Sequence, residues 1–166
     1  VVPVPPLPPI FTTTALDGKV ALAWKNNSEV TTGAFFQGYR VYKSLTGLSG
    51  SFTKAAEFDK PDGITSVPEI TINENGFVET KELVVGSDNG LQYSYVDNGL
   101  INGIGYYYNI IGYDYDAART PLLLESSIST GLIRAVPMKP LLGTQYNGSV
   151  DSVTHSGASD GLVQFE

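Results

Sequence analysis

The sequence predicts an all-β domain built as a sandwich of antiparallel sheets, and three observations lead to that prediction. Several short segments alternate apolar and polar residues with a period of two, and turn residues separate them. No segment sustains the 3.6-residue apolar period of an amphipathic helix. Residues 97–114, DNGLINGIGYYYNIIGYD, pass from a loop rich in Gly and Asn into alternating aromatic and branched residues, as a strand entering a sandwich does. The 166 residues, 42% of them hydrophobic, suffice for the core of one domain.

The first predicted element is a β-hairpin near the N-terminus. Residues 10–15 and 19–25 both favour strands, and Asp17-Gly18 between them is a strong two-residue turn signal. Trp24 falls on the apolar face of the second strand. A polar loop is expected over 26–34.

The next two strands are predicted over 35–44 and 51–58, and the second of them reads as a short edge strand. In the first, FFQGYRVYKS, alternation places Tyr39 toward the interior, whereas Arg40 and Tyr42 face the opposite side. Loops follow both strands, and the second loop, DKPDG, carries its proline and glycine at positions typical of a turn.

Residues 64–90 are interpreted as an insertion that forms an acidic hairpin. The segments 70–72 and 77–85 flank the turn sequence NENG. Four glutamates outnumber Lys81 there, and the apolar alternation is weaker than in the main strands. We therefore expect this hairpin at the periphery. Its glutamates are Glu69, Glu74, Glu79 and Glu82.

The strand that follows the 97–103 loop is the longest predicted one. Alternation turns Tyr106 and Tyr108 toward the interior, and it turns Tyr107 and Tyr113 outward. Together with Trp24, the inward tyrosines are expected to share one interior with Tyr39. This strand is predicted over 104–115, and the remaining strands are predicted over 91–96 and 122–130.

Two extended tails flank the predicted domain at 10–135. Residues 1–9, VVPVPPLPP, predict a stiff proline-rich linker, with a PxxP ligand as the alternative. Residues 136–166 have scattered Pro, Gly and Ser and predict a linker or the start of a further β module. The alternation of VQFE at 163–166 is what a strand donated to an exposed sheet edge needs, so self-assembly through the tails is one hypothesis.

These residues resemble a fibronectin type III-like domain over roughly 8–135. VALAW places Trp24 on the second strand, FQGYRVYKS resembles the third strand, and YSYVDNGLINGIGYYYNIIGYD resembles the fifth strand, the loop and the sixth strand. The resemblance implies an immunoglobulin-like sandwich of about seven strands, in which Leu100 and Tyr106 form a tyrosine corner. It also implies a bacterial secreted or cell-surface protein whose module serves spacing, binding or assembly. The inserted hairpin and the long C-terminal tail depart from a compact module of this family.

Charge and composition exclude several classes of function. The net charge is −7 and no basic stripe is present, so nucleic acid and anionic membranes are not expected partners. No run of 18 apolar residues predicts a membrane span. Without cysteines, the chain forms neither disulfides nor thiolate metal sites.

The chemistry-bearing residues do not predict an enzyme. The single histidine, His155, lies in a Ser- and Gly-rich tail with no orienting partner evident, and no nucleophile–base pair or phosphate loop is recognisable. No cofactor is expected. Calcium is one possibility, because six aspartates at strand ends or loops could supply oxygen ligands, although turns favour Asp in any case. These are Asp59, Asp62, Asp88, Asp97, Asp114 and Asp116.

A surface patch is the predicted binding feature. Arg40, Tyr42, Tyr107 and Tyr113 are expected to face outward on neighbouring strands, where Tyr and Arg favour protein interfaces and flat rings can stack on sugars. A cross-strand ladder that only stabilises the sheet is the alternative. The first functional hypothesis is therefore a non-catalytic structural or adhesive module of an exported protein, with other modules or copies of itself as partners. The second is a carbohydrate-binding accessory module of a secreted hydrolase.

Overall fold

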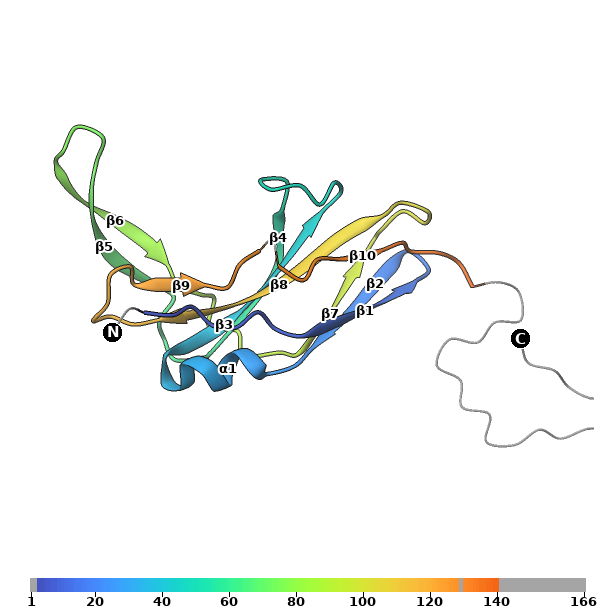
Figure 1. Ribbon diagram of the computed structural model, residues 1–166, viewed down its shortest axis with the longest axis horizontal. Coiled ribbons are helices and arrows are strands. Elements are labelled where there is room, and N and C mark those ends of the chain that lie inside the picture. The colour runs from blue at the N-terminus through green and yellow to red at the C-terminus, as the bar shows by residue number, and fades with distance from the viewer. Residues whose placement is uncertain (1–2, 129, 141–166) are drawn as a thin grey trace, which may run out of the picture.

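The computed structural model describes residues 3–128 and 130–140 and contains mostly β-strands (Figure 1). Both the donated strand predicted at 163–166 and His155 lie outside the described residues. One short helix, α1 (Asn27–Thr32), and a 3-10 turn at Gly33–Phe35 are the described helical elements. The described strands are β1 (Phe11–Leu16), β2 (Lys19–Trp24), β3 (Phe36–Ser44), β4 (Thr53–Asp59), β5 (Ser66–Ile72), β6 (Val78–Val84), β7 (Ser94–Asn98), β8 (Tyr106–Tyr115), β9 (Leu123–Glu125) and β10 (Ile133–Ala135).

The strands form two larger antiparallel sheets and one separate hairpin. The first sheet has the order β1-β2-β7, and the second has the order β10-β8-β3-β4, with β9 also pairing with β8. The hairpin β5-β6 forms a two-stranded sheet of its own. In the β1-β2 pair, Leu16 lies opposite Lys19, which leaves Asp17 and Gly18 as the predicted two-residue turn. Gly18 has a φ of 63°, which glycine adopts without strain.

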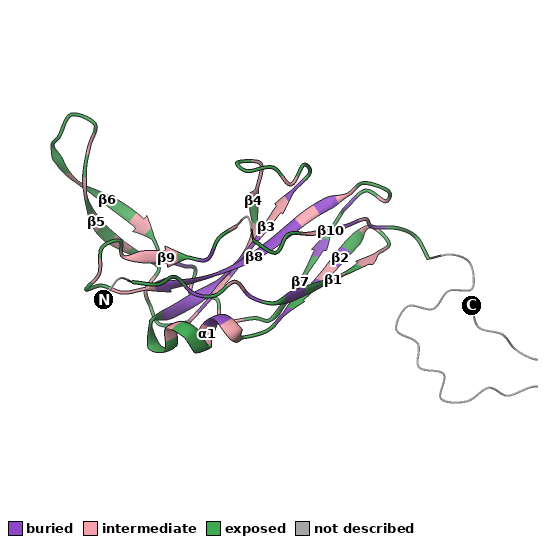
Figure 2. Cartoon of the chain, in the orientation of Figure 1, coloured by how far each residue is buried: buried purple, intermediate pink, exposed green. Residues whose placement is uncertain are grey.

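One apolar core joins the two larger sheets. Trp24 from the first sheet and Tyr39, Tyr106 and Tyr108 from the second belong to the same buried cluster. The rings of Trp24 and Tyr39 meet edge to face, with centroids 5.8 Å apart. Buried residues follow β8 along its length (Figure 2). The prediction that these four rings share one interior is confirmed, as expected for an all-β sandwich.

The loop before β8 is tied to the strand that follows it. The backbone N–H of Ile101 donates a hydrogen bond of 3.1 Å to the hydroxyl of Tyr106. The neighbouring Leu100 is 9% exposed and belongs to the core, and its N–H donates to the carbonyl of Gly18 at 2.8 Å. The Tyr106 ring thus spans from core to loop, and the loop in turn holds the β1-β2 turn.

Helix α1 occupies the segment predicted as a loop at 26–34, and it contacts the proline-rich N-terminal segment. The Ser28 hydroxyl donates to the carbonyl of Leu7 at 2.6 Å, and the Asn27 side-chain amide donates to the carbonyl of Pro8 at 2.9 Å. A six-residue helix gains little from propensity alone, so these tertiary contacts stabilise it. The sequence prediction of a loop here is wrong because the stabilising contacts come from residues some twenty positions away.

The closing strand predicted over 122–130 is shorter in the structure. β9 ends at Glu125, and the Ser126 side chain accepts a hydrogen bond of 2.9 Å from the N–H of Gly112. The chain then leaves the ladder and returns to β8 as β10, after Gly131 with a φ of 78°. Of the predicted strand only 123–125 forms a strand, β9, and a second short strand, β10, lies beyond the predicted bounds; the two pair with different parts of β8.

Candidate interaction site

The four residues of the predicted patch do not form one exposed surface. Alternation assigned their face correctly, but Arg40 is only 8% exposed and Tyr113 is fully buried, so the prediction of exposure is wrong for both. Tyr42 and Tyr107 are half-buried. The cause is long-range, because a later stretch of chain at 85–89 folds back over this outer face of the β3-β8 sheet.

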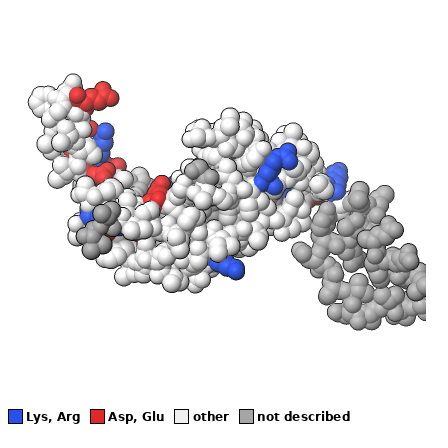
Figure 3. Space-filling model, in the orientation of Figure 1, with Lys and Arg blue, Asp and Glu red and all other residues white. Residues whose placement is uncertain are grey.

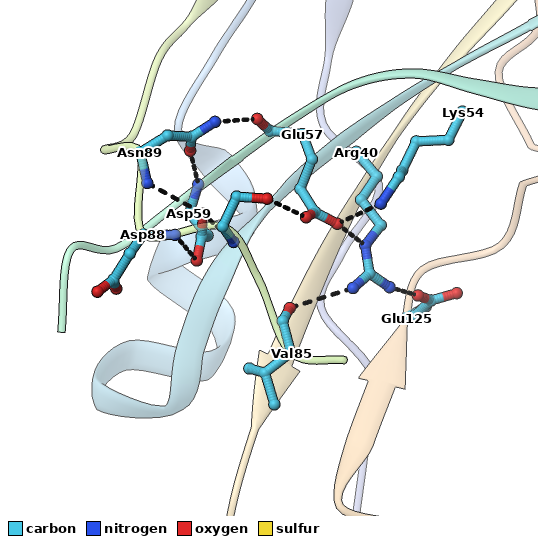
Figure 4. Close-up of polar contacts among 9 residues, drawn as sticks. Arg40, Lys54, Glu57, Asp59, Val85, Asp88, Asn89 and Glu125 are labelled. Carbon is cyan, nitrogen blue, oxygen red and sulfur yellow. Dashed lines mark hydrogen bonds and ion pairs between the residues drawn. The ribbon is translucent and has the colours of Figure 1, made fainter. Parts of the chain in front are cut away.

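Arg40 is the centre of a polar network on that covered face (Figure 4). Its guanidinium carbon lies 4.1 Å from the centroid of the Tyr113 ring, a cation–π contact. Its Nε donates to Glu57 at 2.6 Å and its Nη2 donates to the carbonyl of Val85 at 3.1 Å, while its Nη1 pairs with Glu125. One side chain thus connects β3, β4, β9 and the end of the inserted hairpin.

The electrostatics of this network keep both partners charged. Burial alone would lower the pKa of Arg40, but the hydrogen bond to Glu57 and the nearby carboxylates raise it above its ordinary value. Burial likewise acts to raise the pKa of Glu57, yet hydrogen bonds from Arg40 and Lys54 hold it below its ordinary value. A carboxyl held in its charged form suits an ion pair and is unsuited to donating a proton at neutral pH.

Asp59, at the end of β4, fixes the foot of the inserted hairpin. This residue is fully buried, and its carboxylate accepts hydrogen bonds of 3.1 Å from the backbone N–H groups of both Ser87 and Asp88. In return, the Asn89 side chain accepts from the N–H of Asp59 at 3.1 Å and donates to the carbonyl of Glu57 at 2.7 Å. The strand end and the returning segment therefore satisfy each other's backbone groups.

Gly86 makes this close approach possible. A Cβ atom built at position 86 would lie 1.8 Å from Oδ2 of Asp59, a distance no side chain can occupy. Only glycine lets the returning segment lie against the carboxylate. Sequence reasoning named Asp59 only as a possible calcium ligand and missed Gly86 and Asn89, although the turn sequences DKPDG and GSDNG lie at the two ends of the 64–90 segment.

Beyond its anchored foot, the β5-β6 hairpin projects from the body of the domain (Figure 1). The expectation that this hairpin lies at the periphery is confirmed, and its being an insertion in a compact sandwich stays a prediction. Figure 3 shows acidic and basic side chains on a hairpin surface that is otherwise uncharged. Five large apolar side chains of the hairpin are between 58% and 75% exposed: Ile70, Ile72, Phe77, Val78 and Val84. By the register of the hairpin, four of them, Ile70, Ile72, Val78 and Val84, point to the same side, and exposed apolar residues gathered on one face are typical of interaction surfaces.

The aspartates considered for calcium are engaged by protein donors. Asp97 accepts from the Tyr108 hydroxyl at 2.8 Å and pairs with Lys43 at 2.9 Å, and Asp114 pairs with Arg119 at 2.5 Å. Within the described part of the chain, no three His, Asp or Glu side chains gather as ligands for a metal ion. Two open hollows, of about 350 and 590 Å³, have neither a histidine nor a carboxylate in their linings.

Neither a protein-family model nor a curated protein matches the sequence. No helix among the described residues has the length and apolar character needed to cross a membrane. The fold and the anchored hairpin are therefore the basis for any functional argument.

Proposed function

We propose that this chain is a non-catalytic structural or adhesive module of an exported protein, built as a fibronectin type III-like sandwich. The order of strands is the observation that supports this proposal best. When β3 and β4 are taken as the third and fourth strands and β7 and β8 as the fifth and sixth, the fourth strand pairs with the third. In a constant-type immunoglobulin domain the fourth strand joins the other sheet, so the order favours the fibronectin type III arrangement.

The placement of the chain ends supports a spacing role. The described chain begins near the β9 end of the domain and leaves from the opposite end, beyond β10 (Figure 1). A module with its ends so placed holds whatever precedes and follows it apart along its long axis. The pair Arg40–Glu57 joins β3 to β4, Lys43–Asp97 joins the two larger sheets, and Arg119–Asp114 holds the turn after β8, which agrees with a scaffold rather than a catalyst.

Single-molecule pulling on handles attached at residues 3 and 140 tests the structural proposal. A spacer must keep its length under load, and a domain with one core should lose it in a single all-or-none event. Gradual extension without a resolved unfolding event would refute a structural role.

Self-assembly through the tails is tested separately, by size-exclusion chromatography with light scattering on the whole chain and on one ending at Pro140. A monomer that is unchanged by the truncation would count against assembly.

The carbohydrate-binding alternative loses one of the three exposed tyrosine rings that it requires. It relied on Tyr42, Tyr107 and Tyr113, and Tyr113 is fully buried beneath Arg40. The Tyr107 ring faces the Arg134 guanidinium at 6.0 Å and is only partly accessible. A glycan array with a Tyr107→Ala control tests what remains, and binding that ignores this substitution would remove the alternative.

A further inference from the structure

The hydrogen-bond ladder of the projecting hairpin defines which backbone groups point outward. The N–H of Asn73 donates to the carbonyl of Phe77 at 2.9 Å, and the N–H of Val85 donates to the carbonyl of Thr65 at 2.8 Å. Both pairs belong to the one continuous register of β5 and β6. Because hydrogen-bonded and non-bonded pairs alternate in an antiparallel ladder, every second residue turns its N–H and C=O away from the partner strand. On β6 these residues are Val78, Thr80, Glu82 and Val84.

The two edges of the hairpin differ in their ability to accept a further strand. On β5 the outward position between Ser66 and Ile70 is occupied by Pro68, which has no N–H to donate. Proline at such a place blocks strand addition. β6 carries no proline, and no strand of the described residues pairs with its outer edge. The hairpin is thus closed on its β5 edge and open on its β6 edge.

The open edge borders an apolar face. Ile72 lies directly opposite Val78 in the register, so both side chains point to the same side of the hairpin, as does that of Val84. Each of these three side chains is more than half exposed. A strand added beside β6 would extend this face and cover it with every second side chain. The fixed foot at Asp59 holds the edge in place before binding, which reduces the entropy lost on association.

Charge indicates what kind of strand fits. The hairpin carries four glutamates and one lysine, Lys81, in a chain whose net charge is −7. The chain's own residues 141–166 contain three acidic residues and no Lys or Arg, so they would be repelled. A second acidic hairpin from another copy would be repelled as well. A basic strand is attracted, which favours a different protein as the partner.

We propose that the outer edge of β6 is a docking site for an extended segment of another protein, in which apolar residues alternate with Lys or Arg. The segment would add to the hairpin by main-chain hydrogen bonds, with its apolar residues continuing the exposed face. Its basic residues would lie on the opposite face of the hairpin, which carries Glu69 and Glu79, whereas Glu82 shares the side of Val78 and Val84. This inference rests on the proposed function as a binding or structural module and names the chemistry of its partner.

Binding of designed peptides to the whole chain tests the proposal. The probe is a labelled nine-residue peptide of alternating Val and Lys, followed by fluorescence anisotropy, and the matched probe has Glu in place of each Lys. We expect the Val/Lys peptide to bind and the Val/Glu peptide to bind at least about tenfold more weakly. Equal binding of the two peptides, or no binding of either, would overturn the proposal.

Two variants of the chain locate the site. Thr80→Pro removes an outward N–H at the middle of the β6 edge, whereas Thr80→Val keeps it. We expect the first to weaken the Val/Lys peptide by about tenfold or more and the second to leave its affinity unchanged, because main-chain bonds provide the affinity in strand addition. Binding that tolerates the proline would refute docking at this edge.

A charge-reversed variant covers the case in which proline disturbs the hairpin itself. Glu69→Lys with Glu79→Lys leaves the backbone intact, reverses the charge of the face that the peptide's charged residues would meet, and should exchange the preference, so that the Val/Glu peptide binds more tightly than the Val/Lys peptide. Dimerisation of the parent chain that Thr80→Pro abolishes would also overturn the proposal, since the occupant would then be a second copy. Pulling experiments on Thr80→Pro should match those on the parent chain, so failure of docking and failure of the structural role remain distinguishable.

Discussion

Replacing Asp59 by Ala should release the foot of the inserted hairpin from the sandwich. The carboxylate is fully buried and accepts two backbone hydrogen bonds of 3.1 Å, from Ser87 and Asp88. A third contact, to the N–H of Asn89 at 3.5 Å, is too long to count on. The truncation leaves these backbone donors without an acceptor inside the protein.

The expected loss follows from the two well-formed bonds. A hydrogen bond to a charged group contributes about 1.5–3 kcal/mol, so two together contribute about 3–6 kcal/mol. Ser87 is exposed and water can reach its N–H, which places the loss near the lower end, at about 3 kcal/mol. Asp59→Asn keeps one acceptor oxygen and should lose about half as much.

Urea denaturation measures the change in the free energy of unfolding, and limited proteolysis within 64–90 measures local release. We expect Asp59→Ala to accelerate cleavage in this segment. The matched control is Asp62→Ala, because Asp62 is exposed and its carboxylate accepts from the N–H of Ile64 at 3.0 Å and from the Gln37 side-chain amide at 3.1 Å, neither of which belongs to the segment 85–89. The reasoning fails if Asp59→Ala changes stability by less than about 1 kcal/mol, or if Asp62→Ala has an equal effect.

Three further predictions use the same geometry. Tyr106→Phe removes the acceptor of the Ile101 N–H while keeping the ring, so a chemical melt should show a loss of about 1 kcal/mol, and an unchanged stability would contradict the role of that bond. Gly86→Ala forces the segment 85–89 away from the Asp59 carboxylate. A double-mutant cycle should therefore show that Gly86→Ala lowers the free energy of unfolding much less when Asp59 is already Ala. Full additivity of the two substitutions would refute the contact. Burial raises the pKa of six of the described tyrosines above its ordinary value of 10, most strongly for Tyr39, Tyr108 and Tyr113; the others are Tyr42, Tyr93 and Tyr95. Because these groups ionise first in the unfolded chain, stability should fall as the pH rises above about 10, by at most about 1.4 kcal/mol per pH unit for each tyrosine. Tyr39→Phe should reduce the slope by the share of one tyrosine, and a flat profile in urea melts would contradict their burial.

The part of the fold that depends on strand periodicity was predictable from the sequence. A strand alternates its faces regardless of its neighbours, so Trp24, Tyr39 and Tyr108 were assigned to the interior correctly. What covers the opposite face depends on where distant segments return. Arg40 and Tyr113 were therefore expected at the surface, although the chain at 85–89 folds over that face and β9 supplies a partner for Arg40.

The same limit applies to the candidate site. The insertion and its acidic character were readable from composition, and its turn was readable from NENG. The buried role of Asp59 was not, because aspartate before a proline-containing turn is ordinary in any exposed loop. Helix α1 was missed for a related reason, since its stability comes from contacts with Leu7 and Pro8 rather than from its own six residues.

Residue-resolved amide hydrogen exchange, with and without the Val/Lys peptide, tests most directly whether an anchored hairpin offers an open edge. In the free chain we predict slow exchange at Ser87 and Asp88, whose N–H groups bond to Asp59, and fast exchange at Thr80 and Glu82 on the outer edge of β6. The peptide should slow exchange at Thr80 and Glu82. Fast exchange at Ser87 and Asp88 in the free chain, or no protection of Thr80 and Glu82 by the peptide, would contradict the account.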